Sequence, residues 1–295
     1  MNLAKPRILI QLDTDPHASV FDGVVAVDAG VEHLFQYSNV RPDAVRALVH
    51  GAMFTRGPSD LHCTSIFVGG SDVEIGRGVA EAARMSCFDP FRVSIMHDSN
   101  GCNSTAAAAV LCAEKHIDFS KSTSLVLAAT GAVGQAVCRL ITSQGGAVVL
   151  ASRKLQRANE CCEMLVRQGI RSDLLIPLGT ENSDSLTEVL QRIEAVFGCG
   201  AAGAELLNSD QLSQAPRLLT AVDLNAVPPA GIAGILVTDH AVQRDRRVDY
   251  GALGVGGLKM KIHKAAIREL FTANNHFIDA FRMIEIGRSI LQTSK

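Results

Sequence analysis

The segment from Leu125 to Ala158 contains a glycine turn between two short apolar runs, and this pattern constrains the fold most strongly. Its centre reads Ala129-Thr130-Gly131-Ala132-Val133-Gly134, a Gly-x-Gly-x-x-Gly nucleotide turn that lacks the first glycine. The second glycine of such a turn lets the backbone approach a pyrophosphate, and the third lets helix and strand pack closely. The order strand, turn, helix and strand therefore predicts a Rossmann-type domain that binds a dinucleotide. Ala129 fits its position only if its φ is negative.

The end of the second apolar run indicates which dinucleotide is bound. NAD-binding domains usually carry an acid there, which hydrogen-bonds the ribose 2′-hydroxyl. This chain has Ser152-Arg153-Lys154 instead, a hydroxyl and two cations that suit a 2′-phosphate. We therefore predict NADP as the cofactor, with NAD as the alternative. Further cofactor contacts are expected from Ala201, Ala202 and Gly203, in a segment 200–203 that should pass the ribose, and from Asn225.

Apolar runs and helical segments alternate along most of the chain, which predicts an α/β protein with parallel sheets. The strands are expected at 8–13, 64–70, 92–98, 125–129, 148–152, 174–177, 194–200 and 218–225. A capping box at Ser71 and Glu74 is expected to open the helix that ends near Met85. The C-terminal helices have no strands of their own, so they should pack on the first sheet. The predicted domains are residues 1–120 with 251–295, which bind the substrate, and residues 121–250, which bind the dinucleotide, with hinges near 118–122 and 246–252.

Polar residues follow three strands of the first domain, at the points where those strands end. They are Asp13 and Asp15, Gly69-Gly70, and Asp98 with Asn100. Because ligands bind beyond the carboxyl ends of parallel strands, we expect these clusters to meet at one edge and line a substrate site. The alternative is that the same side chains cap turns and helices.

The composition of the 295-residue chain argues against several classes of protein. Its net charge of -2 gives no overall attraction to nucleic acid or anionic membranes, and it has no Trp on which bases could stack. The eight cysteines form no CxxC pair and no metal-finger spacing, so neither a metal site nor a disulfide framework is predicted. No apolar run suits a signal peptide or a membrane span. We expect a soluble, cytoplasmic protein with a small-molecule substrate.

Two longer blocks carry a specific resemblance. FRVSIMHDSNGCNSTAAAAV (91–110) and YGALGVGGLKMKIHKA (250–265), with matching segments at 11–22, 37–45, 55–57, 64–70 and 222–235, resemble the methylene-tetrahydromethanopterin dehydrogenases of methylotrophic bacteria. The resemblance covers nearly the whole chain, in order. The sequence departs from the family pattern at Ala129 and over about 157–205.

The resemblance implies hydride transfer from methylene-tetrahydromethanopterin to NADP, with tetrahydrofolate as an alternative carrier, in a homo-oligomer that is a trimer or hexamer. The product is a delocalised methenyl cation, so the reaction needs positioning and exclusion of water rather than a general base. We therefore assign no catalytic residue, although nearby carboxylates would stabilise the cation. The residues expected to bind the pterin are Asp13, Asp15, His17, Asp98, Asn100 and Lys259.

Two other functions remain open at this point. Another two-domain NADP dehydrogenase, of the shikimate type, would need a Lys–Asp proton-transfer pair, which Lys259 and Asp98 could imitate. A nucleotide- or pterin-binding regulator without turnover is favoured by the alanine at 129. His263 is expected to be structural, and Lys261 to face solvent.

Overall fold

The computed structural model describes residues 5–293 and divides the chain into two compact units, each built on its own sheet. Unit 1 contains the residues up to 104 and those from 260 onward, and unit 2 contains residues 105–259. The divisions fall inside helices α4 (Cys102–Glu114) and α9 (Ala252–Glu269), and so differ from the domain limits drawn from the sequence. The segment expected to be a hinge near 118–122 belongs to unit 2, because the buried Phe119 stacks on Phe197.

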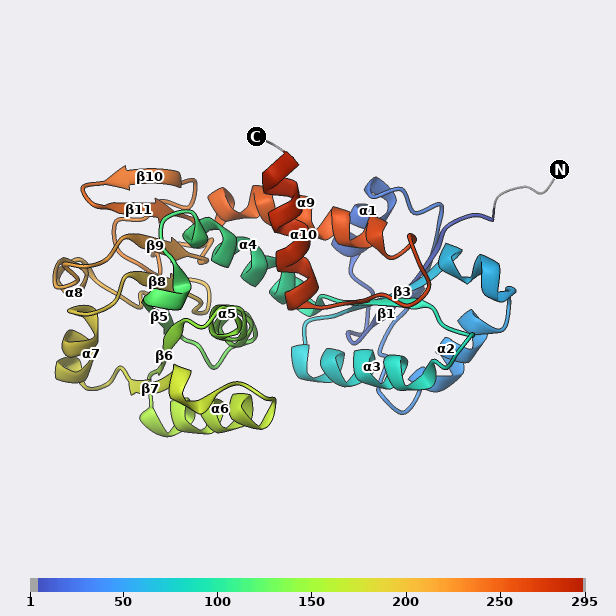
Figure 1. Ribbon diagram of the computed structural model, residues 1–295, viewed down its shortest axis with the longest axis horizontal. Coiled ribbons are helices and arrows are strands. Elements are labelled where there is room, and N and C mark those ends of the chain that lie inside the picture. The colour runs from blue at the N-terminus through green and yellow to red at the C-terminus, as the bar shows by residue number, and fades with distance from the viewer. Residues whose placement is uncertain (1–4, 294–295) are drawn as a thin grey trace. The chain divides into compact units, whose positions relative to one another are not determined.

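Unit 1 has a five-stranded parallel sheet in the order β12-β4-β3-β1-β2. Its strands are β1 (Ile8–Asp13), β2 (His33–Tyr37), β3 (Thr64–Gly69), β4 (Ser94–His97) and β12 (Phe277–Ile278). Its helices, besides parts of α4 and α9, are α1 (Val20–Asp28), α2 (Val45–Met53), α3 (Val73–Ser86) and α10 (Ala280–Thr293). Figure 1 shows α2 and α3 lying side by side along this sheet.

The alternation of side chains along β1 and β3 separates two faces of this sheet. Ile10 is paired in register with Ile66, and both join the core formed with α2 and α3. The opposite face buries polar groups, which need hydrogen-bond partners inside the protein. The Ser65 hydroxyl donates to the carbonyl of Leu270 at 3.1 Å, which fastens the end of α9 to β3.

The C-terminal segment contributes a strand as well as helices. We expected helices only, but β12 lies parallel to β4, with Phe277 paired to Ile95. The strand is two residues long, too short for a period-two pattern to appear in the sequence.

Unit 2 has a seven-stranded sheet in the order β10-β11-β9-β8-β5-β6-β7. The strands are β5 (Thr123–Leu127), β6 (Ala147–Ser152), β7 (Leu175–Gly179), β8 (Ala195–Gly198), β9 (Thr220–Asp223), β10 (His240–Arg244) and β11 (Arg247–Tyr250). The remaining helices are α5 (Ala132–Ser143), α6 (Leu155–Arg167), α7 (Ser183–Leu190) and α8 (Ser209–Ser213). In this sheet the β10–β11 pair is antiparallel, and the other strand pairs are parallel.

The strand order of unit 2 reverses direction at β5, whose neighbours are β6 and β8. This is the switch point at which doubly wound sheets bind ligands. The predicted α/β class, with a Rossmann-type domain and a second parallel-sheet domain, is confirmed. Among the helices of residues 5–293, none combines the length and the apolar character needed to cross a membrane.

Candidate dinucleotide and substrate sites

The glycine turn joins β5 to α5 and is held by backbone hydrogen bonds. The amide of Ala129 donates to the carbonyl of Ala151 in β6 at 2.9 Å, and that of Gly131 donates to Ala128 at 3.2 Å. The residue with a left-handed backbone is Ala128, at φ 52°, so the missing glycine at 129 does not itself force a positive φ. An alanine in this conformation stores about 1–2 kcal/mol of strain.

A cavity of about 660 Å³ opens at the carboxyl ends of β5, β6 and β8, beside the glycine turn. Five of the predicted cofactor residues line it: Thr130, Gly131, Ser152, Arg153 and Ala201. Lys154 lines an adjoining recess of about 250 Å³. The other predicted residues, Ala132, Val133, Gly134, Ala202, Gly203 and Asn225, are not among the lining residues.

The cavity also has lining residues that were not predicted. They are Leu127, Ala128, Arg157, Thr180, Cys199, Ala204, Glu205 and Leu206. Gly200, the first residue of the segment 200–203 expected to pass the ribose, lines the cavity as well. Arg157 could have been found, because a helix that begins just after Lys154 places it in the first turn. Thr180 could not have been found from the sequence, because it follows β7 and its place depends on the pairing of β7 with β6. Its amide donates to the carbonyl of Ser152 at 2.9 Å.

The residues of the turn fit a dinucleotide. A Cβ added to Gly131 would meet only the Ala128 carbonyl, at an ordinary 3.5 Å, so packing within the protein does not demand a glycine there. Instead the bare backbone of this exposed glycine leaves room beside the cavity for a phosphate. The start of α5 lies at the same turn, and its amides and dipole favour an anion.

Asn225 organises a loop of unit 2 through three hydrogen bonds to the backbone. Its Oδ1 accepts from the amides of Gly203, at 3.3 Å, and Val227, at 3.0 Å, and its Nδ2 donates to the carbonyl of Pro229 at 2.7 Å. Asp223, buried at the end of β9, accepts the amides of Asn225, Gly231 and Ile232. Burial raises the pKa of Asp223 above its ordinary value although these amides oppose the shift. The predicted contact at Asn225 is therefore a group that holds the loop 201–203.

Hydrogen bonds bring the three polar clusters of unit 1 together at one edge of its sheet. The Asp15 carboxylate accepts from the amide of Ser71 at 3.0 Å and from its hydroxyl at 2.7 Å. The amide of Asn100, a residue with φ 52°, donates to the carbonyl of Gly70 at 2.8 Å. The predicted capping box is wrong: the Ser71 hydroxyl is used on Asp15, and Asp72 caps α3 by accepting from the amide of Ile75.

Asp13 is buried at the end of β1, and its carboxylate is occupied within the chain. Its Oδ1 accepts from the amide of Asp15 at 3.0 Å. Its Oδ2 accepts from the amide of Ser19 at 2.9 Å and from the Gln11 side chain at 3.1 Å. Asp13 therefore fixes the loop that leads into α1, and any effect it has on a ligand acts through that loop.

Asp98 and His263 form a buried pair in unit 1. His263 Nδ1 lies 2.7 Å from Asp98 Oδ2, while Asp98 Oδ1 accepts the amides of Asn103 and Ser104 at the start of α4. Burial by itself would raise the pKa of Asp98, but the hydrogen bonds from His263 and Ser104, with the histidine charge, hold it below its ordinary value. Nε2 of the fully buried His263 has no hydrogen-bond partner among the described residues. The pair ties α9 to the carboxyl end of β4.

The remaining predicted substrate residues are more accessible. His17 is exposed on the loop that follows β1, and Asn100 is exposed at the end of β4. Lys259 is half-buried on α9, at the last position of unit 2.

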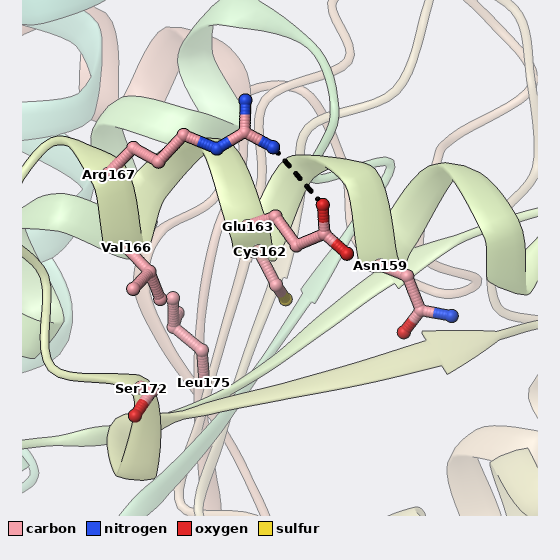
Figure 2. Close-up of a pocket in the computed structure, with 7 residues that line it drawn as sticks. All are labelled: Asn159, Cys162, Glu163, Val166, Arg167, Ser172 and Leu175. Carbon is pink, nitrogen blue, oxygen red and sulfur yellow. Dashed lines mark hydrogen bonds and ion pairs between the residues drawn. The ribbon is translucent and has the colours of Figure 1, made fainter.

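Another cavity, of about 540 Å³, lies on the flank of α6 beside the start of β7 (Figure 2). Val166 and Leu175 give it an apolar wall, and the Cys162 sulfur points into it from the helix. Glu163 and Arg167 form an ion pair at 3.2 Å above it. The predicted site residues do not line this cavity.

The fold and the glycine-turn cavity define an α/β protein with a Rossmann-type sheet and a cavity at its switch point. Residues 20–100 match the family described as methylene-tetrahydromethanopterin dehydrogenase, N-terminal. The chain is 39% identical over 286 residues to the bifunctional protein MdtA of Methylorubrum extorquens, covering 96% of this chain and 99% of that protein. It therefore belongs to the methylene-tetrahydromethanopterin dehydrogenase family, as the sequence blocks indicated.

A second relative agrees with this assignment, and a solved structure shares the fold. The NAD(P)-dependent methylenetetrahydromethanopterin dehydrogenase of Methylorubrum extorquens is 29% identical over 293 residues, covering 95% of this chain and 98% of that protein. Shikimate 5-dehydrogenase from Listeria monocytogenes has a TM-score of 0.51 at 12% identity, covering 99% of this chain and 97% of that one. The latter likeness shows the two-domain fold alone.

Proposed function

We propose that this protein is an NAD(P)-dependent methylene-tetrahydromethanopterin dehydrogenase. In this reaction a hydride leaves the methylene bridge of the reduced pterin, and the methenyl form is the product. One observation carries the proposal: a cavity large enough for much of a dinucleotide lies at the switch point of unit 2, in a chain related over nearly its full length to a protein named for this activity.

The residues of unit 2 would act by binding and orientation. Gly131 and the start of α5 would hold the pyrophosphate, and Ser152, Arg153 and Lys154 would hold the adenosine ribose. Bound NADP supplies the hydride acceptor. Because no proton has to be removed from the reacting carbon, the protein needs to position the carbon and exclude water, and no side chain has to act as a base.

In unit 1, the substrate residues divide into those that hold loops and those that are accessible. Asp13 and Asp98 are buried, and their carboxylates are occupied, so we propose that they position the loops at the edge of the sheet. The exposed His17 and Asn100 are the candidates for direct contact with the pterin, with the partly exposed Asp15, whose carboxylate also accepts from Ser71. Lys259, which belongs to unit 2, is the other proposed contact. The occupied carboxylate of Asp98 also counts against a Lys–Asp proton-transfer pair, which a hydroxy-acid dehydrogenase would require.

The experiment that tests the function measures initial rates of methylene-carrier oxidation at the absorbance of the reduced nicotinamide. Tetrahydromethanopterin and tetrahydrofolate derivatives are each paired with NADP and with NAD. We expect turnover with the methanopterin derivative and NADP. Tight cofactor binding with no turnover in any pairing would reject the proposal and favour a regulator.

We also propose that the protein is a cytoplasmic homo-oligomer, a trimer or hexamer. Apolar side chains on α1, spaced so that they share one side of the helix, support self-association: Val20, Val24 and Val27 are all exposed. The edge strand β2 adds exposed Phe35 and Tyr37. The cytoplasm is a reducing compartment, which suits the free thiols of the eight cysteines.

A further inference from the structure

A basic recess extends the dinucleotide cavity toward the first turn of α6. It is lined by Ser152, Arg153, Lys154, Arg157 and Glu181. Three of these residues, Ser152, Arg153 and Arg157, also line the larger cavity beside the glycine turn. A single ligand can therefore reach from that turn into the basic recess.

Backbone contacts fix the walls of the recess. The ladder between β6 and β7 continues past the strand ends, where the amide of Glu181 donates to the carbonyl of Arg153 at 3.2 Å. A Cβ on Gly179 would come within 2.9 Å of the nitrogen of Leu155, so the first residue of α6 packs directly over this glycine. These contacts hold Glu181 and the start of α6 beside the Ser152–Lys154 segment.

The cations of the recess are left available for a ligand. Within residues 5–293, no ion pair or side-chain hydrogen bond engages Arg153, Lys154 or Arg157. In contrast, Arg167 on the same helix is paired with Glu163. Three cationic side chains and one carboxylate line the recess, and the first turn of α6 contains no acid and has no side-chain cap. Ser152, which is only 7% exposed, adds a hydroxyl at the floor.

We propose that Arg157 determines the choice between NADP and NAD by binding the adenosine 2′-phosphate in the basic recess, and that Glu181 accepts a hydrogen bond from the free 2′-hydroxyl of NAD. This assignment rests on the proposed function, since it requires a dinucleotide in the cavity. The planar guanidinium of Arg157 can donate two hydrogen bonds to a phosphate, and helical geometry brings it beside the residues that follow β6. An acid that binds the ribose hydroxyls is usual in NAD-binding domains, and here it comes from the turn that follows the neighbouring strand β7. The recess thus contains groups for both cofactors.

The test uses the full chain and two fragments that lack nicotinamide, 2′-phospho-ADP-ribose and ADP-ribose, with affinities measured by isothermal titration calorimetry. Arg157→Gln should weaken the binding of 2′-phospho-ADP-ribose by about tenfold or more, because a charge-assisted hydrogen bond is lost. It should change the affinity for ADP-ribose by less than about twofold. Glu181→Gln should weaken ADP-ribose by about threefold and tighten the phosphorylated fragment, because a nearby negative charge is removed. Arg167→Gln, on the same helix but outside the recess, is the matched control and should change neither affinity (Figure 2).

Equal weakening of both fragments by Arg157→Gln, or no weakening of either, would overturn the assignment. The same holds if Arg167→Gln acts like Arg157→Gln. The fragment affinities do not depend on the pterin, so the two proposals fail separately. If the protein still distinguishes the two fragments but turns over no carrier, the dehydrogenase proposal is rejected and the role of Arg157 stands. If the enzyme turns over and Arg157→Gln leaves the KM for NADP unchanged, only the role of Arg157 is rejected.

Discussion

Gly134 lies so close to Ala129 that a Cβ on the glycine would come within 2.6 Å of the alanine Cα and 3.0 Å of its carbonyl carbon and oxygen. The first turn of α5 therefore packs directly on the backbone that leaves β5. Gly131, three residues earlier, has no such contact. The two glycines of the turn consequently serve different purposes, one for packing and one for the ligand.

This difference predicts opposite results for two alanine substitutions. Gly134→Ala should reduce the free energy of unfolding by about 2 kcal/mol, because backbone atoms must move to admit the methyl group. Gly131→Ala should leave stability almost unchanged but weaken dinucleotide binding by about tenfold, because the methyl group occupies space beside the phosphates. Urea unfolding and calorimetric titration of NADP measure the two effects. Loss of stability in Gly131→Ala, with normal binding, would contradict the division of roles.

The Asp98–His263 pair should make stability depend on acid pH. The pKa of Asp98 is lowered in the folded state, so as pH falls below about 4 the unfolded chain takes up this proton first. The stability that Asp98 contributes is fully present above the pKa of this carboxyl in the unfolded chain. It is lost as pH falls through the lower pKa of the folded state. Asp98→Asn should cost about 3 kcal/mol at pH 7, since it breaks a buried pair, and should flatten the loss of stability between about pH 5 and 3.

Urea midpoints at pH 7, 5, 4 and 3 would measure this dependence. Asp43→Asn, at an exposed aspartate that precedes α2, is the control and should keep the wild-type profile. An Asp98→Asn profile with the wild-type slope below pH 5 would show that the pair does not carry the acid sensitivity.

The central strands of both sheets could be predicted from the sequence, because buried parallel strands appear as apolar runs that end in polar or glycine residues. It missed β2, where the exposed strand His33–Tyr37 has no period-two contrast between its faces. It also missed the β10–β11 hairpin, whose turn uses Asp245 at φ 52° in place of the Asn-Gly or Asp-Gly pair that marks such turns.

For the candidate site, residues adjacent to the glycine turn and to β6 could be found from local pattern alone. Thr180 and Glu181 could not, since their places depend on the pairing of β7 with β6. The same holds for Asp98, whose partner His263 is distant in sequence. A pattern names the side chain, but only the fold shows whether its carboxylate is free for a ligand or already occupied.

Asn225 should matter for both the stability of its loop and cofactor binding. Asn225→Ala removes three hydrogen bonds to the backbone, which are worth roughly 1 kcal/mol each, and releases the loop at Gly203. We expect about 2 kcal/mol less stability and a several-fold weaker affinity for NADP, measured by urea unfolding and calorimetry. Asn159→Ala, on the flank of α6 (Figure 2), should change neither quantity. If Asn225→Ala leaves the affinity for NADP unchanged, the loop that Asn225 holds does not contribute to cofactor binding.

The apolar stripe on α1 predicts where self-association can be broken. Val24 is 57% exposed at the middle of the stripe, so a charge there would have to be buried in any interface that covers it, which costs several kcal/mol. Val24→Glu should therefore reduce the mass measured by light scattering after size exclusion, while circular dichroism stays unchanged because the side chain is exposed in the single chain. Val166→Glu, at an exposed valine of α6 in unit 2, is the control and should retain the wild-type mass. A wild-type monomer would reject the proposed oligomer, and a Val24→Glu variant with the full mass would move the interface away from α1.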